Sequence, residues 1–551
     1  MILGNINRIN LSTSFFERLI AENCLYVDKT RFIENFLNMA SDVLLITRQR
    51  RLGKSLNMDM LRCFLTSDND YRYLFKGTYI ETSPAWEKAN SAPAFIFDFK
   101  SLRSGDYEEQ IYEQSVTFAQ LIAESENLTN VTKRKLQRLV NGKVTSAECI
   151  FRLSELVHLI TSKKPYIFID EYDSLLIKNF GSEKYDEIRL FLTDLISAAM
   201  KGNPHLQKAL ITGVMRISYE SMFSGLNNIV SFDMFNDNVF TDDYGFTEAE
   251  ARRLCELAYV NIDEVRDWYN GVRVCGQAIF STFSTLNYID KKVLGCYWGK
   301  SGNLEMIMDL LTDRRRDVLT TLLNDGRVTV SVDSRISLKE LFEANTDEAF
   351  YSLLVQGGYL AHEKDNPASN ICTLYIPNTE LRIVWQSFIL NKYFPSHPRL
   401  RTIFANANDM DAFAVDLERF LQDRLSFHDL AVYQGENPET VHERVYHIYM
   451  LGILAAYDDT RYKPPSSNRE SGRGRYDILV EKHEANYIFE FKGAKSEKGL
   501  ARAASNALRQ IDEKRYGGDL SIDKPIVKVG IAIFGKSCKV KARFAEGVGK
   551  W

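Results

Sequence analysis

The chain has 551 residues, of which 45% are hydrophobic and 26% charged, and its formal net charge is −4. These values are ordinary for a soluble globular protein, and the 12 prolines and 30 glycines exclude a collagen-like or low-complexity chain. The eight cysteines form no C-x-x-C pair, which argues against a zinc ribbon and a disulfide framework. No apolar run approaches the length of a membrane span, and the first residues do not read as a secretory signal. We therefore expect a cytoplasmic protein of several domains with no membrane partner.

Short, almost continuous apolar runs alternate with helical patterns up to about residue 240. The runs are Asp42–Thr47, Ala94–Phe99, Pro165–Asp170 and Ala209–Thr212. Strands that helices cover on both faces have this composition, because neither side of the strand meets water. The pattern therefore predicts a parallel α/β sheet with helices around it.

The segment after the first run has the features of a phosphate-binding loop. It ends in Gly53, Lys54 and Ser55, and a helical pattern follows. In such a loop the backbone N–H groups hold phosphate, the lysine reaches the β- and γ-phosphates, and the serine hydroxyl binds Mg²⁺. Arg48 stands where the GxxxxGK[ST] pattern has its first glycine. The cluster formed by Arg48, Arg50 and Arg51 could add positive charge around the phosphates or restrict the loop.

Two later strand ends supply the other groups that a nucleotide site needs. Asp170 and Glu171 end the third run; the first would hold Mg²⁺ and the second would orient or deprotonate the attacking water. Thr212 and Arg216 follow the fourth run and suit a sensor of the γ-phosphate. ATP and Mg²⁺ are therefore the expected ligands. A degenerate fold that keeps the sheet and binds nothing is the alternative.

The remaining chain divides into a helical part and a basic part. Residues 241–425 are mostly helical in pattern, with Thr247 as the expected N-cap of the first helix. We expect a P-loop domain at 1–240, a helical linker or lid at 241–425 and a third domain at 426–551. Residues 461–551 carry a net charge of +9, whereas the other 460 residues carry −13. This asymmetry is compatible with a nucleic-acid partner and also with a solvated lysine-rich face.

The C-terminal part contains carboxylates in a pattern that suits metal-dependent phosphodiester chemistry. Two strands are expected at 476–480 and 486–492, with a turn between them. Glu490 and Lys492 share one face of the second strand, and a hairpin can bring Asp477 beside them. Two carboxylates can hold Mg²⁺, and a nearby lysine can position the water that it activates. The alternative is a cross-strand salt bridge without catalytic function.

Further elements complete this pattern. A helix at 497–516 is expected to turn Gln510 toward the sheet, and a strand at 525–534 closes the unit. A helix at about 439–457 precedes the hairpin and carries Glu443. This order of elements is that of a restriction-endonuclease-like α/β core.

Ten segments together closely resemble the AAA-ATPase-like proteins that carry a C-terminal PD-(D/E)XK nuclease domain. They are Tyr26–Thr30, Arg48–Ser55, Ile169–Asp173, Thr212–Ser218, Phe223–Asn228, Tyr244–Thr247, Trp268–Gly271, Ile376–Asn378, Ser467–Asp477 and Glu490–Lys492, spread over nearly the whole length. The departures are modest: the family loop typically reads RPRRFGKS, and Gln49 and Leu52 replace its proline and phenylalanine here.

The resemblance implies a fused NTPase and nuclease. It gives Asp477 and Glu490 as metal ligands, Lys492 as the catalytic lysine, Glu443 as a supporting acid and Gln510 as a contact to the site or its backbone. We expect the nucleotide domain to control a Mg²⁺-dependent nuclease that acts on DNA rather than RNA. One alternative is a nucleotide-switched nucleic-acid-binding or signalling module with an inactive nuclease fold, and another is an ATPase acting on protein complexes. A homo-oligomer is left open.

Overall fold

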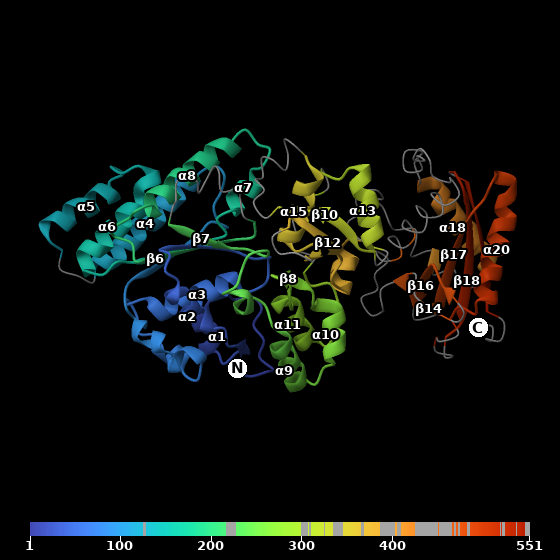
Figure 1. Cartoon of the computed structure of the whole chain (residues 1–551), viewed down its shortest axis with the longest axis horizontal. Helices are drawn as coiled ribbons and strands as arrows, with labels where there is room; N and C mark the ends of the chain where they lie inside the picture. The colour runs from blue at the N-terminus through green and yellow to red at the C-terminus, as the bar shows by residue number, and fades with distance from the viewer. Residues whose placement is uncertain are drawn as a thin grey trace. The chain divides into compact units, whose positions relative to one another are not determined.

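The computed structural model describes residues 1–124, 128–215, 228–298, 307, 310–323, 326–333, 345–364, 369–385, 403–404, 409–424, 450, 454, 466–467, 470–471, 474–481, 485–517, 520, 524–535 and 537–545. The chain forms two compact units. The N-terminal unit comprises Met1–Ser301 and Arg327–Thr379, and the C-terminal unit comprises Gly302–Gly326 and Glu380–Trp551. Each unit contains a β-sheet with helices packed on it (Figure 1), so the expected α/β class is confirmed.

The N-terminal unit is built around a parallel sheet of order β4-β5-β6-β3-β7. Its strands are β3 (Val43–Thr47), β4 (Ala94–Asp98), β5 (Tyr166–Asp170), β6 (Lys208–Gly213) and β7 (Ile229–Phe232). The inner strands β3, β5 and β6 are buried at every residue, which explains their almost continuous apolar sequences. The predicted parallel sheet is confirmed.

The edge strand β7 was absent from the sequence prediction. Ile229 and Phe232 are buried, whereas Val230 is 39% exposed. An edge strand that is partly solvated lacks the continuous apolar run that marked the inner strands, so its sequence gave a weaker signal.

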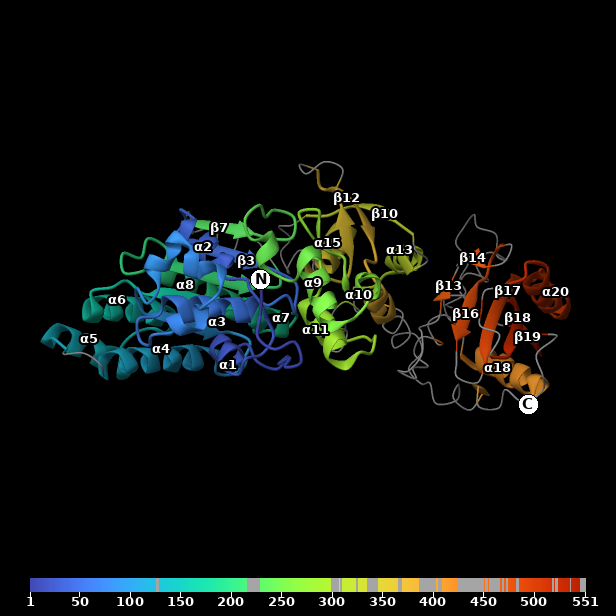
Figure 2. The same ribbon diagram turned by 90° about the horizontal axis from the view of Figure 1, so that it is seen from below.

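Helices cover both faces of this sheet. In Figure 1 α4 (Tyr107–Glu124), α6 (Cys149–Thr161) and α8 (Tyr185–Met200) lie on one face, and α2 (Arg31–Asn38) and α3 (Lys54–Leu65) lie on the other. Figure 2 gives the same helices in the turned view. The smaller elements of this region are β1 (Ile2–Leu3), α1 (Phe16–Ala21), β2 (Tyr26–Val27), α5 (Asn130–Val140) and α7 (Ser174–Lys178).

The expected separate domain at 241–425 does not match the compact units, because much of it packs with the first 240 residues. The Lys29 ammonium pairs with Glu250 at 2.7 Å, and Asn57 donates to the Asp243 carbonyl at 2.8 Å. This part contains α9 (Glu248–Ala258), α10 (Ile262–Tyr269), α11 (Thr282–Lys291), α15 (Asp347–Gly357), the hairpin β8 (Val272–Val274) and β9 (Gln277–Ile279), and the antiparallel sheet of β10 (Val328–Ser331), β12 (Ile371–Tyr375) and β11 (Ala361–Glu363). Thr247 is the N-cap of α9 in a capping box, as predicted.

The C-terminal unit has a mixed sheet of order β13-β16-β17-β18-β19. Its strands are β13 (Ser466–Ser467), β16 (Ile478–Glu481), β17 (Asn486–Gly493), β18 (Ile526–Phe534) and β19 (Ser537–Phe544). Strands β17 and β18 are parallel, and the other neighbours are antiparallel. The expectation that the strand at 525–534 closes the unit is wrong, since β19 pairs with β18 beyond it. Lysines alternate with apolar residues in β19, so its sequence lacks an apolar run.

Two helices pack on the two faces of this mixed sheet. α18 (Met410–Arg424) shares a core cluster with Tyr487, Phe489 and Phe491, whereas α20 (Leu500–Glu513) shares its cluster with Ile488. Because side chains alternate along a strand, Glu490 and Lys492 lie on the face that α20 covers. Other described elements of the C-terminal unit are α13 (Asp313–Leu323), β14 (Glu470–Ser471) and β15 (Gly474–Arg475).

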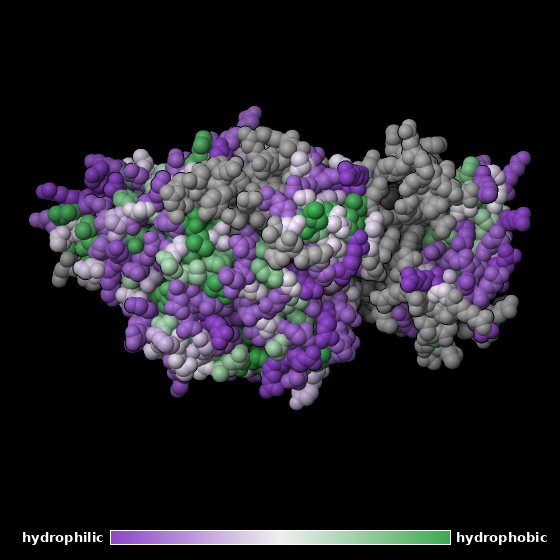
Figure 3. Space-filling model, in the orientation of Figure 1, coloured by the Kyte–Doolittle hydropathy of each residue, from purple (hydrophilic) through white to green (hydrophobic). Residues whose placement is uncertain are grey.

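The surface seen in Figure 3 is mainly hydrophilic, and hydrophobic side chains form small separate areas on it. The outer side of α20 is covered by hydrophilic side chains (Figure 3). In the part of the chain that the structure describes, none of the helices has both the length and the apolar character needed to cross a membrane.

Gly530 permits the close approach of α20 to β18, so we predict that Gly530→Ala destabilises the C-terminal unit. A Cβ atom there would lie 2.5 Å from the Ala504 carbonyl oxygen and 3.0 Å from Leu508. Forcing the helix away should cost about 1–3 kcal/mol of unfolding free energy, measured by urea unfolding followed by circular dichroism. Gly105→Ala is the matched control, because a Cβ atom there meets nothing within 4 Å. Equal stability of the two variants would contradict the prediction.

Candidate functional site

The expected phosphate-binding loop connects β3 to α3. Gly53 precedes α3 with a φ of 91°, a left-handed conformation that glycine adopts without strain. The Lys54 ammonium donates hydrogen bonds to the carbonyl oxygens of Arg48 at 2.9 Å and Gln49 at 3.0 Å. Burial lowers the pKa of Lys54, although nearby carboxylates act in the opposite direction. The loop thus presents a buried cation at the start of a helix.

Three of the predicted nucleotide-site residues meet at the carboxyl edge of the sheet. The Ser55 hydroxyl donates to one carboxylate oxygen of Asp170 at 2.5 Å, and the Thr212 hydroxyl donates to the other at 2.5 Å. They come together because β5, β6 and β3 are neighbours in the sheet. Serine hydroxyl and aspartate oxygens are hard ligands that suit Mg²⁺, and the α3 N-terminus and Lys54 suit phosphate. The residues present therefore fit a magnesium nucleotide.

Glu171 lies beside this cluster, and its backbone φ of 50° is in the left-handed region. Its carboxylate pairs with the Lys100 ammonium at 3.4 Å. Lys100 follows β4, where Asp98 is the register partner of Asp170. Neither Asp98 nor Lys100 was predicted as a site residue, although both lie at the end of an expected strand, where such residues gather.

The three loop arginines do not act as one cluster. The Arg48 guanidinium is fully buried and pairs with Asp237, so the expectation that this side chain adds charge around the phosphates is corrected. The Arg51 guanidinium lies over the Phe283 ring, 3.6 Å from its centroid. Arg50 is half-buried in the loop. Arg216, the predicted sensor arginine, lies outside the described residues.

Asp173 holds the backbone that follows β6. Its carboxylate accepts hydrogen bonds from the N–H groups of Val214 at 2.9 Å and Met215 at 2.8 Å. Burial raises the pKa of Asp173 to about 6, even though these two bonds and Lys54 favour the ionised form. Asp173 was expected only as part of the family segment Ile169–Asp173, without a role of its own.

The second predicted site lies on β16 and β17. Ile478, the first residue of β16, pairs with Phe489 across the two antiparallel strands, and Asp477 directly precedes it. The Asp477 carboxylate accepts from the Phe491 N–H at 2.7 Å. Burial raises the pKa of Asp477, while this hydrogen bond and Lys492 lower it.

Glu490 is 1% exposed, and Lys492 and Gln510 contact its carboxylate. The Lys492 ammonium lies 3.4 Å from one carboxylate oxygen, and the Gln510 amide of α20 donates to the same oxygen. The Tyr516 hydroxyl lies 3.5 Å from the Gln510 amide nitrogen. Tyr516 was not among the predicted residues, because its position six residues after Gln510 follows no strand or helix periodicity. Glu443 and most of the helix expected at 439–457 lie outside the described residues.

Two carboxylates and one lysine on a sheet face suit a divalent cation with oxygen ligands. Among the residues that the structure describes, no group of three or more His, Cys, Asp or Glu side chains is placed to hold a metal. Mg²⁺ usually keeps several waters and takes one or two carboxylates from a protein. The pair formed by Asp477 and Glu490 therefore fits Mg²⁺.

We predict that Asp173→Asn removes a pH-dependent loss of stability. Because burial raises the folded-state pKa to about 6 from 3.8, wild-type stability falls as pH rises through this interval and stays lower above it. The stability advantage of the asparagine variant over the wild type should grow by about 1–2 kcal/mol between pH 5.0 and pH 7.5, as measured by urea unfolding. Asp186→Asn, on the exposed side of α8, should show no such trend. A difference independent of pH at position 173 would refute the assignment.

Two family models match the chain, and each covers one of the two candidate sites. Residues 10–223 match the family model described as predicted AAA-ATPase, and residues 441–543 match that of the PD-(D/E)XK nuclease superfamily. An uncharacterised protein in the vnfD 5′ region of Azotobacter chroococcum mcd 1 is 26% identical over 544 residues, covering 95% of this chain and 96% of that protein. The chain thus joins an AAA-ATPase-like domain to a domain of the PD-(D/E)XK nuclease superfamily.

Proposed function

We propose that this protein binds ATP and cleaves phosphodiester bonds of nucleic acid, DNA in preference to RNA, in a metal-dependent reaction under nucleotide control. The observation that carries the proposal is the hydrogen bond from the Phe491 N–H of β17 to Asp477, which directly precedes β16 and so lies beside Glu490 and Lys492. The Gln510 amide is bound to Glu490 at the same point. A cross-strand salt bridge alone would not need a second carboxylate or the amide of a helix at the same point.

Each of these side chains has a role that follows from its surroundings. Asp477 and Glu490 would hold Mg²⁺, which would polarise the scissile phosphate and lower the pKa of a bound water. The Lys492 ammonium, next to Glu490, would orient that water or neutralise charge that develops on the phosphate. Gln510 fixes the Glu490 carboxylate and so keeps it turned toward the site.

The charge distribution supports nucleic acid as the substrate. The last 91 residues carry a net charge of +9. Some of the basic side chains in this unit pair with acids, as Lys528 and Arg543 do with Asp512. Lys495 and Arg502 are exposed after the carboxyl end of β17, near Lys492 in the chain. Positive charge beside a metal site attracts the phosphate backbone at any sequence.

The N-terminal site supplies the groups for nucleotide control. Lys54 and the α3 N-terminus would bind the phosphates, Ser55 and Asp170 would hold Mg²⁺, and Glu171 would act on the attacking water. Thr212 adds a hydroxyl at the same edge of the sheet. Residues for binding and for hydrolysis are both present, which favours an active ATPase over a degenerate fold.

We predict that Asp477→Asn lowers the rate of nucleic-acid cleavage at least about 100-fold, because one of the two metal ligands loses its charge. The assay would use single- and double-stranded DNA and RNA with Mg²⁺ or Mn²⁺. Glu513→Gln, in an exposed ion pair of α20 with Arg509, is the matched control and should cleave like the wild type. Undiminished nucleic-acid binding together with no cleavage by the wild type would instead favour an inactive nuclease fold.

We predict that Lys54→Ala abolishes any effect of ATP on cleavage while leaving cleavage without ATP within about twofold, because the two sites lie in different compact units. Loss of the ammonium removes the cation that contacts the phosphates. Cleavage rates with and without ATP would be compared with binding of a fluorescent ATP analogue. Survival of the ATP effect in a protein that no longer binds the analogue would exclude control through this loop.

A further inference from the structure

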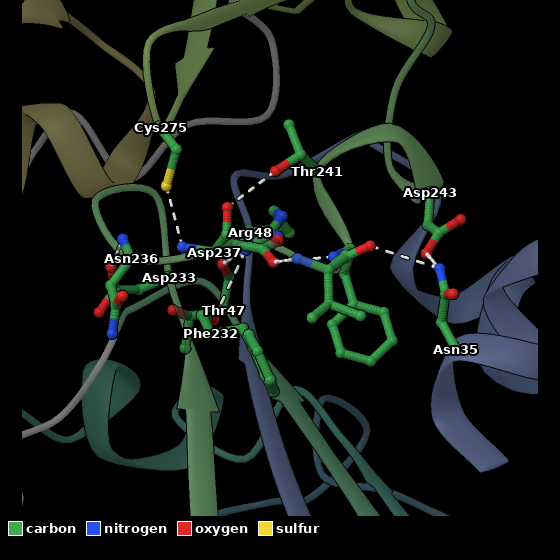
Figure 4. Close-up of polar contacts among 12 residues, drawn as sticks. Asn35, Thr47, Arg48, Phe232, Asp233, Asn236, Asp237, Thr241, Asp243 and Cys275 are labelled. Carbon is green, nitrogen blue, oxygen red and sulfur yellow. Dashed lines mark hydrogen bonds and ion pairs between the residues drawn. The ribbon is translucent and has the colours of Figure 1, made fainter. Parts of the chain in front are cut away.

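Arg48, the first residue of the phosphate-binding loop, is bound to a buried carboxylate and not directed to the expected phosphates. Figure 4 shows the Arg48 side chain directed to Asp237, in the segment after β7. Both side chains are fully buried. One Arg48 nitrogen also donates to the Thr47 carbonyl at 2.8 Å and lies 3.5 Å from the Phe232 carbonyl. Arg48 therefore joins the ends of β3 and β7 to Asp237.

Asp237 organises the segment to which Arg48 is bound. One of its carboxylate oxygens accepts from the N–H groups of Val239 and Phe240, each at 2.8 Å. Its own N–H donates to the Cys275 sulfur at 2.9 Å (Figure 4). Cys275 stands in the β8–β9 turn with a φ of 47°, and its N–H donates to the Met234 carbonyl. Cys275, an exposed residue, is thus two contacts away from the loop arginine.

The next loop residues are attached to the same part of the unit. The Gln49 amide donates to the Val355 carbonyl of α15 at 3.3 Å, and the Leu52 carbonyl accepts from the Gly245 N–H at 2.9 Å. The loop is therefore anchored at three positions to chain segments beyond residue 230. Movement of the loop backbone would be transmitted through these anchors.

Lys54 provides the connection between phosphate and the Arg48 anchor. Its ammonium donates to the carbonyl oxygens of Arg48 and Gln49. A bound β- or γ-phosphate would compete for the same N–H groups, so the two peptide groups would lose part of their interaction with the cation. A ligand shifts a conformation only through contacts that differ between two states, and this exchange of partners is such a difference.

We propose that Asp237 is a positioning residue for the nucleotide site: its buried ion pair with Arg48 couples phosphate binding at the loop to the β8–β9 turn that bears Cys275. The proposal rests on the proposed nucleotide binding. Apolar side chains of similar volume could hold the loop without the desolvation of two charges. The ion pair is therefore expected to serve the coupling between the loop and the β8–β9 turn and not only the stability of the fold.

The test measures the alkylation rate of Cys275 by N-ethylmaleimide in the full chain, with peptide mass spectrometry to separate the cysteines. Cys296, a partly buried cysteine of the same unit, is the internal reference. Saturating ATP with Mg²⁺ should raise the Cys275 rate at least threefold relative to Cys296 in the wild type. In the double variant Arg48→Met, Asp237→Asn the rise should disappear and the affinity for ATP should fall about fivefold or more.

The double variant is chosen because Asp237→Asn alone would leave the Arg48 charge buried without its counter-ion and could prevent folding. Asparagine retains an oxygen for the Val239 and Phe240 N–H groups. Glu155→Gln, which breaks the half-buried ion pair with Lys135 on α5, is the matched control and should behave like the wild type. An equal rise of Cys275 alkylation in the wild type and the double variant would overturn the proposal.

A second arm tests the coupling without nucleotide. Lys54→Ala removes the contacts with the Arg48 and Gln49 carbonyls and should by itself raise the Cys275 rate at least twofold, but not in the double-variant background. If ATP does not bind the wild type while this pattern holds, the proposed nucleotide binding fails and the coupling stands. If ATP binds and neither arm changes Cys275, the coupling is refuted and the nucleotide site stands.

Discussion

The carboxylate of Asp170 is the group on which the N-terminal site depends. It receives hydrogen bonds from Ser55 at the start of α3 and from Thr212 at the end of β6. Three chain segments thereby converge on one buried side chain, because parallel strands bring their carboxyl ends to one edge of the sheet. Without the order β5-β6-β3 the two hydroxyls could not reach one carboxylate.

The C-terminal unit reaches a comparable arrangement by different means. The antiparallel pairing of β16 and β17 brings Asp477 to the Phe491 N–H, and Glu490 and Lys492 share one face because side chains alternate along β17. The helix α20 can come close only because Gly530, the neighbour of Glu490 on β18, has no side chain. In both units burial disfavours charge on the functional groups, as the raised pKa of Asp477 and the lowered pKa of Lys54 show. A ligand of opposite charge would offset that cost.

The buried ion pair of Arg48 and Asp237 attaches the phosphate-binding loop to a chain segment outside the parallel sheet. It connects the loop to a segment that leads into β8, β9 and α9, and the Lys29 pair with Glu250 reinforces the same junction. Residues 241–301 and 327–379 therefore belong to the same compact unit as the loop. A movement of the loop backbone would therefore be passed through the Arg48–Asp237 ion pair to residues outside the sheet.

Features that depend on short stretches of chain could be predicted from the residues alone. The apolar runs of β3, β5 and β6 identified a parallel sheet, the Gly53-Lys54-Ser55 segment identified the loop, and the two-residue spacing of Glu490 and Lys492 placed them on one face. Each signal comes from local periodicity or from a motif of adjacent residues, so no knowledge of distant partners was required.

The directions of the long side chains and the partners that they contact depend on the packing of the whole chain. Arg48 appeared suited to phosphate, yet its partner Asp237 lies 189 residues away in the chain and draws the guanidinium into the interior. The contact of Gln510 with Glu490, the pairing of β19 and the attachment of residues 241–301 to the first unit are likewise long-range. A flexible charged side chain has several partners within reach, and the free energy of burying and pairing it chooses among them only after the chain has packed.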